Sequence, residues 1–338
     1  MNERISRRRA IGSGLAIGGG IALSQAIGRG AGAQTPAASP AASPAAGAWS
    51  FTDDRGITVS LPARPTRVVA QTSSAASLWD FGFEVVGFYG PNDPDNTAGF
   101  PQVGDMDVAR IPNLGDYGAL DLEKVVALDP ELYVDLDRGG DTLWYLDADS
   151  QAAIEQICPT IGINADGVSV VDIVKRYDDL AVALGVDPAS ETIASAKETF
   201  AASEAAFKET VAAHSGLKVL TVSSGEDGTA YIWNPNWLPD LIYFTSLGFT
   251  GVGAGVDDRT PNAQVSMEQL GAYPADVILV DVREDLTAFE GNAIWETLPA
   301  VQAGQVGRWY AAFPYSYQKL AKVLDLTGET LAAAKPVV

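Results

Sequence analysis

Residues 122–134 read LEKVVALDPELYV, and residues 267–280 read MEQLGAYPADVILV. Each stretch begins with a short amphipathic segment, continues through a turn that contains proline, and ends in an uninterrupted apolar run. Proline cannot continue a helix, because it lacks an N–H group and its ring clashes with the preceding turn. An apolar run of this length is typical of a strand that is buried on both faces. The helix–turn–strand pattern thus occurs once in each half of the chain and predicts two related lobes.

Around these two stretches, short apolar runs alternate with segments of helical spacing. In the first half we expect strands at 68–70, 84–89, 132–136 and 160–163, and helices at 73–81, 121–128 and 151–157. In the second half we expect strands at 217–222, 277–282 and 306–310, and helices at 237–247, 266–270 and 315–331. Apolar strands separated by helices predict parallel sheets with helices on both faces.

One long helix is expected between the two halves. Asp187 fits the N-cap position, Pro188 fits the first helical position, and Gly216 fits the stop. Residues 188–213 would span about 39 Å at ~1.5 Å per residue. A helix of this length predicts a stiff connection that limits opening between the lobes. His214 at its end is expected to interact with the negative end of the helix dipole.

Together these elements predict an α/β protein with two three-layer lobes, mainly parallel sheets, one connecting helix and a ligand cleft between the lobes. The predicted divisions are an export signal at 1–33, an Ala/Pro/Ser linker at 34–48, an N-terminal lobe at 49–187, the connecting helix at 188–214 and a C-terminal lobe at 215–338.

The N-terminus has the pattern of an export signal. Arg7, Arg8 and Arg9 precede a weakly apolar, Gly-rich stretch, and residues 31–33 (Ala-Gly-Ala) form a small-residue cleavage site. This pattern resembles a twin-arginine signal and predicts export to the periplasm or the outer face of the cell membrane. A retained transmembrane anchor is the alternative, which the glycines disfavour. No lipobox cysteine follows the stretch, so a lipid anchor is not expected.

Composition excludes several classes of function. The chain has 338 residues, 22 Lys and Arg against 43 Asp and Glu, and a formal net charge of −21. A protein this acidic is not expected to bind nucleic acid. Cys158 is the only cysteine and His214 the only histidine, so we expect no disulfide, no directly bound metal and no intrinsic cofactor. The G-x-S-x-G, H-E-x-x-H and P-loop motifs are missing, which disfavours an exported enzyme.

The order of the elements resembles the helical-backbone (class III) substrate-binding proteins of ABC importers. Besides the long helix, the blocks that carry the resemblance are RVVAQTSSAASLWDFGFEVVGF (67–88), NLGDYGALDLEKVVALDPELYV (113–134), VSMEQLGAYPADVILV (265–280) and IWETLPAVQAGQVGRW (294–309). The resemblance covers Thr66 to Leu331. It implies a non-catalytic monomer that captures a ferric siderophore, haem or cobalamin and delivers it to an ABC permease.

The resemblance also implies how the protein contacts its permease. One glutamate from each lobe meets the transporter in this family, and Glu123 and Glu268 occupy the matching positions. Two carboxylates on equivalent helices can contact a two-fold symmetric basic surface. Without the resemblance, both residues would be ordinary solvated acids on a helix face.

Candidate ligand-binding residues lie just beyond the carboxyl ends of the expected strands, where open α/β sheets bind ligands. Many of them are aromatic, which favours a large and partly apolar ligand. They are Tyr89, Tyr117, Arg138, Trp144, Trp233, Trp237, Arg283, Trp309, Phe313 and Tyr315.

The ligand class follows from a comparison with hydroxamate-siderophore binders of the same family. Tyr117 stands where they carry a ligand-contacting arginine, Phe313 where they carry a tryptophan, and Tyr315 where they carry a ligand-contacting tyrosine. The lost cation disfavours strongly anionic catecholates, because the cations left near the cleft are Arg138, Arg283 and Arg308. We therefore expect a neutral or hydroxamate-like siderophore that itself carries the ferric iron. The alternatives are haem or cobalamin, iron bound directly by tyrosine phenolates, and a ligand sensor for a membrane receptor.

Overall fold

The computed structural model describes residues 48–91, 102–140, 142–225, 228–253, 260–283 and 286–338. The predicted export signal (1–33) and all but the last residue of the predicted linker lie outside the described residues. All of the described residues fall within one compact unit, which contains a two-stranded hairpin, a four-stranded sheet and a six-stranded sheet.

The first sheet has four strands in the order β4-β3-β5-β6, all parallel. The strands are β3 (Val68–Gln71), β4 (Gly87–Tyr89), β5 (Leu132–Asp137) and β6 (Thr160–Asn164). The helices around them are α1 (Thr72–Asp80), α2 (Leu122–Ala127), α3 (Ala148–Ile157) and α4 (Val170–Ala183). The prediction of a parallel N-terminal sheet is confirmed, although β4 begins only at Gly87 and not at Glu84.

Three elements of this lobe were not predicted, namely α4 and the two strands of a hairpin. An antiparallel hairpin of β1 (Trp49–Thr52) and β2 (Thr58–Leu61) precedes the sheet. Its buried Trp49 donates a 2.8 Å hydrogen bond from Nε1 to the carbonyl of Ala183, where α4 ends. The hairpin is therefore fixed to the lobe by its first residue.

The second sheet is mixed and runs β10-β8-β7-β11-β12, with β9 also paired to β7. Its strands are β7 (Lys218–Ser224), β8 (Thr229–Trp233), β9 (Thr250–Val252), β10 (Asn262–Ser266), β11 (Val277–Asp281) and β12 (Val306–Trp309). The pairs β9–β7, β7–β11 and β11–β12 are parallel, whereas β7–β8 and β8–β10 are antiparallel. The parallel core is as predicted, but β8, β9 and β10 were not.

The helices of the second half are short, apart from the last. They are α6 (Pro239–Ser246), α7 (Met267–Leu270), α8 (Pro299–Gln302) and α9 (Tyr317–Ala332), with 3-10 turns at Leu286–Phe289 and Trp295–Thr297. The helix predicted from residue 315 begins at Tyr317, because the Ser316 side chain caps it by accepting from the backbone N–H of Lys319.

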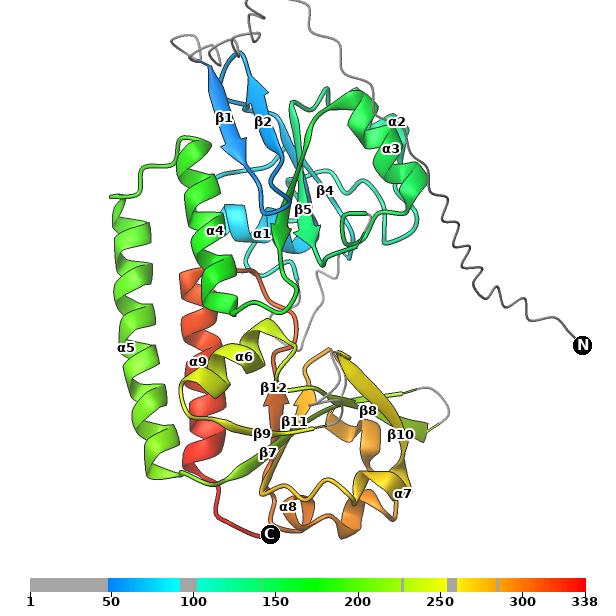
Figure 1. Cartoon of the computed structure of the whole chain (residues 1–338), viewed down its shortest axis with the longest axis vertical. Helices are drawn as coiled ribbons and strands as arrows, with labels where there is room; N and C mark the ends of the chain where they lie inside the picture. The colour runs from blue at the N-terminus through cyan, green and yellow to red at the C-terminus, as the bar shows by residue number, and fades with distance from the viewer. Residues whose placement is uncertain (1–47, 92–101, 141, 226–227, 254–259, 284–285) are drawn as a thin grey trace, which may run out of the picture. The chain divides into compact units, whose positions relative to one another are not determined.

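The connecting helix is α5 (Glu191–Ala213), which begins three residues later than predicted. Its N-cap is Ser190, whereas the Asp187 carboxylate accepts from the N–H of Ala189 in the preceding turn. Its 23 residues correspond to about 35 Å at ~1.5 Å per residue. Figure 1 shows α9 lying alongside α5. His214 ends α5 with its ring nitrogen Nδ1 3.0 Å from the carbonyl of Thr210, in agreement with a C-terminal role.

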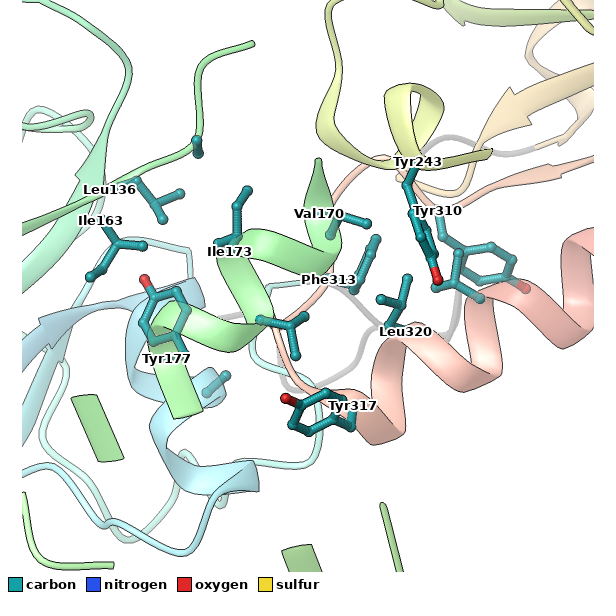
Figure 2. Close-up of a cluster of buried hydrophobic side chains, with 14 of the residues drawn as sticks. Leu136, Ile163, Val170, Ile173, Tyr177, Tyr243, Tyr310, Phe313, Tyr317 and Leu320 are labelled. Atoms are coloured by element: carbon teal, nitrogen blue, oxygen red, sulfur yellow. The ribbon is translucent and has the colours of Figure 1, made fainter. Parts of the chain in front are cut away.

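A continuous hydrophobic core joins the two sheets. Figure 2 shows part of it, where Leu136 and Ile163 from the first sheet approach Tyr177 of α4, and Phe313 lies between α4 and Leu320 of α9. The same cluster extends to strands of the second sheet. Interiors packed in this way resist sliding, so relative motion of the lobes must preserve this core.

A second segment crosses between the lobes, in addition to α5. After β12 the chain returns to α1, where the N–H of Tyr315 donates to Ser77 Oγ at 2.7 Å and Ser316 Oγ donates to Asp80 Oδ2 at 2.6 Å. Lys319, buried in the first turn of α9, forms an ion pair with Asp105 of the N-terminal lobe. The single connecting helix of the prediction is therefore only one of two links.

Candidate ligand-binding site

A cavity of about 120 Å³ lies where the two lobes face each other. Seven of the ten predicted ligand residues line it: Arg138, Trp144, Trp233, Arg283, Trp309, Phe313 and Tyr315. The remaining walls are formed by Ser73, Gln102, Leu136, Tyr145, Leu238, Ala311 and Ala312. Segments that follow the parallel strands β3, β5, β11 and β12 therefore meet at one site, as expected for the carboxyl ends of strands. Strand β8 is antiparallel to β7 and contributes Trp233, its last residue, to the same site.

Arg138 supplies a positive charge from the loop after β5. Its guanidinium carbon lies 4.2 Å from the centroid of the Trp144 ring, a cation–π arrangement. Its Nε is buried and has no hydrogen-bond partner among the described residues. A buried donor without a partner is unfavourable, so an acceptor oxygen on a ligand would stabilise this arrangement.

Arg283 supplies a second guanidinium, from the loop after β11, but its charge is compensated. Its Nη2 lies 2.5 Å from Asp281 Oδ2, and its Nε lies 3.0 Å from Oδ1. Asp281 is buried at the end of β11. Among the described cavity-lining residues, Arg138 is thus the cation that no described ion pair neutralises.

The C-terminal lobe provides an aromatic wall. The rings of Trp233 and Trp309 lie 5.3 Å apart between centroids. Each indole is oriented by a polar group behind it: Trp233 Nε1 donates to Ser223 Oγ at 2.8 Å, and Trp309 Nε1 donates to Asp240 Oδ2 at 2.6 Å. Indole rings held in this way offer flat apolar area at little conformational cost.

The returning segment adds Phe313 and Tyr315 to the cavity. Tyr315 stacks on Tyr177 of α4, with 6.0 Å between ring centroids and an interplanar angle of 8°. Burial raises the pKa of the Tyr315 phenol, and the nearby positive charge of Arg138 only partly opposes this. The phenol is therefore neutral at physiological pH in the metal-free protein.

Two predicted ligand residues, Tyr89 and Tyr117, lie behind the cavity wall. Tyr117 stacks on Tyr145 at 3.5 Å between centroids, and its hydroxyl lies 3.1 Å from Oε1 of the cavity-lining Gln102. Tyr89 donates from its hydroxyl to the carbonyl of Tyr145 at 3.1 Å. Both tyrosines thus support Tyr145, and a direct contact of either with ligand stays a prediction.

Trp237 and Arg308 are also outside the described lining of the cavity. Trp237 is half-buried against the main core just before α6. Gln102 and Leu238, by contrast, line the cavity without having been predicted. Neither follows an expected strand, and Leu238 lies in the helix expected at 237–247, so nothing in the sequence marked either residue as a ligand contact.

The two candidate permease-contacting glutamates are exposed, one on each lobe. Glu123 lies in the first turn of α2, and Glu268 in the first turn of α7. A backbone hydrogen bond and a hydrogen bond from Ser266 hold the pKa of Glu268 below its usual value. Both side chains are thus accessible to a basic partner, and their docking role stays a prediction.

The described part of the chain contains no group of three or more His, Cys, Asp or Glu side chains arranged to hold a metal ion. None of its helices is both long enough and apolar enough to cross a membrane.

The fold agrees with comparisons to known proteins. The family described as periplasmic binding protein matches residues 90–312. DesE of Streptomyces coelicolor, described as a ferric-siderophore receptor protein, is 33% identical with a TM-score of 0.80, and the match covers 86% of this chain and 100% of that chain.

Two more distant structures share the fold. The siderophore periplasmic binding protein of the Thermobifida fusca fuscachelin gene cluster is 22% identical (TM-score 0.60; 80% of this chain and 97% of that chain). FhuD of Vibrio cholerae, bound to Fe³⁺-Desferal, is 17% identical (TM-score 0.58; 80% and 99%). No match was found among curated proteins. The family match and the full-length likeness to DesE show that the chain belongs to the periplasmic binding protein family.

Proposed function

We propose that this protein captures a ferric siderophore outside the cytoplasm and delivers it to an ABC importer permease. The observation that carries the proposal is the likeness to the ferric-siderophore receptor DesE over the whole of that chain. The aromatic, Arg-containing cavity between the lobes supports it, because these groups suit a large chelate with apolar arms and oxygen acceptors. Membership in a family of binding proteins also favours a non-catalytic role.

Within this class we favour a neutral or hydroxamate-like siderophore over a catecholate. A ferric catecholate carries several negative charges and needs several cations around it. The described cavity lining holds two arginines, and Asp281 already neutralises Arg283. Arg138 alone suits a ligand that presents one or a few partly charged oxygens. Haem and cobalamin are the alternative ligands of the same fold.

Binding must enlarge the cavity. Its volume of about 120 Å³ is below the roughly 300–1,000 Å³ of typical ligand sites. The continuous core and the two links between the lobes favour a small adjustment of loops and wall side chains over wide hinge opening.

The remaining parts of the proposal concern delivery. Glu123 and Glu268 are the proposed contacts with the permease. Residues 1–33 are the proposed twin-arginine export signal. The proposed N-terminal lobe comprises residues 49–187, the proposed connecting segment residues 188–214, and the proposed C-terminal lobe residues 215–338. The protein is proposed to act as a monomer, with iron carried by its ligand.

Isothermal titration of the mature protein tests the function. The ligands are ferric desferrioxamine B as a hydroxamate, a ferric catecholate, haem and cobalamin, with iron-free desferrioxamine B as the control. We expect saturable binding of the ferric hydroxamate with a Kd of about 1 µM or below. A Kd of this size corresponds to a binding free energy of roughly −8 kcal/mol or a more negative value. Preference for haem or cobalamin would replace the proposed ligand, and no binding of any ferric siderophore would reject the proposed function.

A further inference from the structure

A buried carboxylate lies directly behind the aromatic wall of the cavity. Asp240, at the start of α6, is 4% exposed, and its Oδ2 accepts the 2.6 Å hydrogen bond from Trp309 Nε1. Trp309 is itself 1% exposed, lines the cavity and lies against Trp233. The Asp240 carboxylate therefore orients a wall residue without lining the cavity itself.

Several groups face or surround this carboxylate. The backbone N–H groups of Asp240 and Leu241 donate to it, while the negative charge of Asp281 on β11, paired with Arg283, opposes its ionisation. Tyr315 approaches from the returning segment as a neutral phenol. Burial has the largest effect and raises the pKa of Asp240 to about 6.

The elements packed against α6 add no described counter-ion for Asp240. The ion pairs of α4 join its charged residues to one another, to α5 or to the turn after β1, and β9 contains no titratable residue. Glu204 of α5 contacts α6 through the Tyr243 hydroxyl, at 2.5 Å. The protonation state of Asp240 thus acts chiefly on its hydrogen bond to Trp309.

We propose that Asp240 is a positioning residue for ligand binding: its ionised carboxylate holds Trp309 in the cavity wall, and protonation relaxes this restraint. Siderophore affinity then falls as the medium becomes acidic. The inference rests on the proposed function, because it takes the cavity to be the ligand site.

The physical basis is the difference between charged and neutral acceptors. A hydrogen bond to an ionised group is roughly twice as strong as one to a neutral group. A wall residue that is held in place before binding also loses less conformational freedom when the ligand arrives. We expect the affinity to be about fivefold lower at pH 5 than at pH 8, from the difference between these two kinds of hydrogen bond.

The coupling between the two side chains can be measured without ligand. In protein labelled with ¹⁵N-tryptophan, the indole N–H signals are followed by NMR from pH 5 to pH 8, and Trp309→Phe assigns the signal of interest. That signal should titrate with a midpoint near the pKa of Asp240, about 6. The titration should vanish in Asp240→Asn and persist in Asp135→Asn, which removes a buried carboxylate of the other lobe. A Trp309 signal that does not titrate overturns the proposal.

The consequence for binding is measured with ferric desferrioxamine B across the same pH range. The affinity of Asp240→Asn should be independent of pH and should equal that of the wild-type protein at pH 5, because a neutral amide resembles the protonated acid. If Asp240→Asn fails to fold, Trp309→Phe should show the same loss of pH dependence. Wild-type affinity that is equal at pH 5 and pH 8, or a pH dependence that survives in the variant, overturns the proposal.

Failure of the proposed function gives a different result. If no ferric siderophore binds at any pH, the proposed function fails and this inference fails with it. If binding is normal but the Trp309 signal and the affinity are insensitive to pH, this inference alone is rejected.

Discussion

Replacing the buried Lys319 by methionine should destabilise the junction between the lobes in a pH-dependent manner. Lys319 lies at the start of α9 and its positive charge lowers the pKa of Asp80, which burial raises to about 6. Ser316 Oγ donates to Asp80 Oδ2, while Oδ1 is buried and has no hydrogen-bond partner among the described residues. The positive charge of Lys319 is therefore the strongest stabilising influence on the ionised Asp80 carboxylate, ahead of the hydrogen bonds from Ser316 and Gln318.

The magnitude of the loss follows from the difference in burial between the two carboxylates near Lys319, Asp80 and Asp105. Leaving one member of a buried ion pair unpaired costs about 3–5 kcal/mol. The side chain of Asp105, the ion-pair partner, is 71% exposed and is hydrated when Lys319 is absent. We therefore assign the cost to Asp80 and expect a loss of about 3 kcal/mol in the free energy of unfolding at pH 8.

The loss should shrink in acid. Because burial raises the pKa of Asp80, folding favours its protonated form, and the wild-type protein loses this contribution as pH rises through about 6. Removing Lys319 raises this pKa further, so at pH 5 Asp80 is neutral and needs no counter-charge. We expect the loss caused by Lys319→Met to fall to about 1 kcal/mol at pH 5.

Urea denaturation followed by circular dichroism at pH 5 and pH 8 measures both values. Lys175→Met is the matched control, since Lys175 and its partner Asp172 are each 60% exposed and their pair should contribute less than about 1 kcal/mol. The double variant Asp80→Asn/Lys319→Met should recover most of the loss at pH 8. Equal losses for Lys319→Met at the two pH values would refute the electrostatic reasoning.

Three further predictions concern the core, the cysteine and the cavity. Phe207 of α5 is buried, and the centroid of its ring lies 5.2 Å from that of Phe244. Phe207→Ala should therefore lower the free energy of unfolding, measured in urea, by about 3–5 kcal/mol. A loss below about 1 kcal/mol would contradict this packing. Burial raises the pKa of the Cys158 thiol to about 12, so a thiol reagent at pH 8 should react with it only after denaturation. Rapid reaction of the thiol in the native protein would contradict its burial. Arg138→Gln should weaken binding of ferric desferrioxamine B by about tenfold, because it removes a charged donor. Arg308 lies outside the described cavity lining, so Arg308→Gln should leave the affinity within about twofold. Equal effects of the two substitutions in isothermal titration would contradict the proposed position of the binding site.

The parallel part of the fold was predictable because its strands are apolar throughout. In β11 every residue from Val277 to Asp281 is buried, as expected for a strand covered on both faces. In β8 the residues of Thr229–Trp233 are buried only alternately, so a search for continuous apolar runs does not find it. The pattern of α4 was present, with Val170, Ile173, Val174 and Tyr177 on one buried face, and helical periodicity would have identified it.

The site was predictable where topology alone brings residues together. Arg138 and Arg283 follow equivalent strands, and both reach the cavity. The position of Tyr117 behind Tyr145 depends on a stacking contact between two loops, which neither loop encodes alone. The contacts of Tyr315 and Ser316 with α1 join residues more than 200 positions apart in sequence. Such contacts have no local signature, so the second link between the lobes was not predicted.

The most direct test of the proposed binding site is a crystal structure of the protein with ferric desferrioxamine B, with data collected at the iron absorption edge. The anomalous signal of iron locates the metal without reference to any assumed pose. We expect one iron peak in the cavity, between the Trp144 side and the Trp233–Trp309 wall, with a siderophore oxygen bound to Arg138. An iron peak at another place on the protein, or a cavity that stays empty while the protein binds the complex in solution, would contradict it.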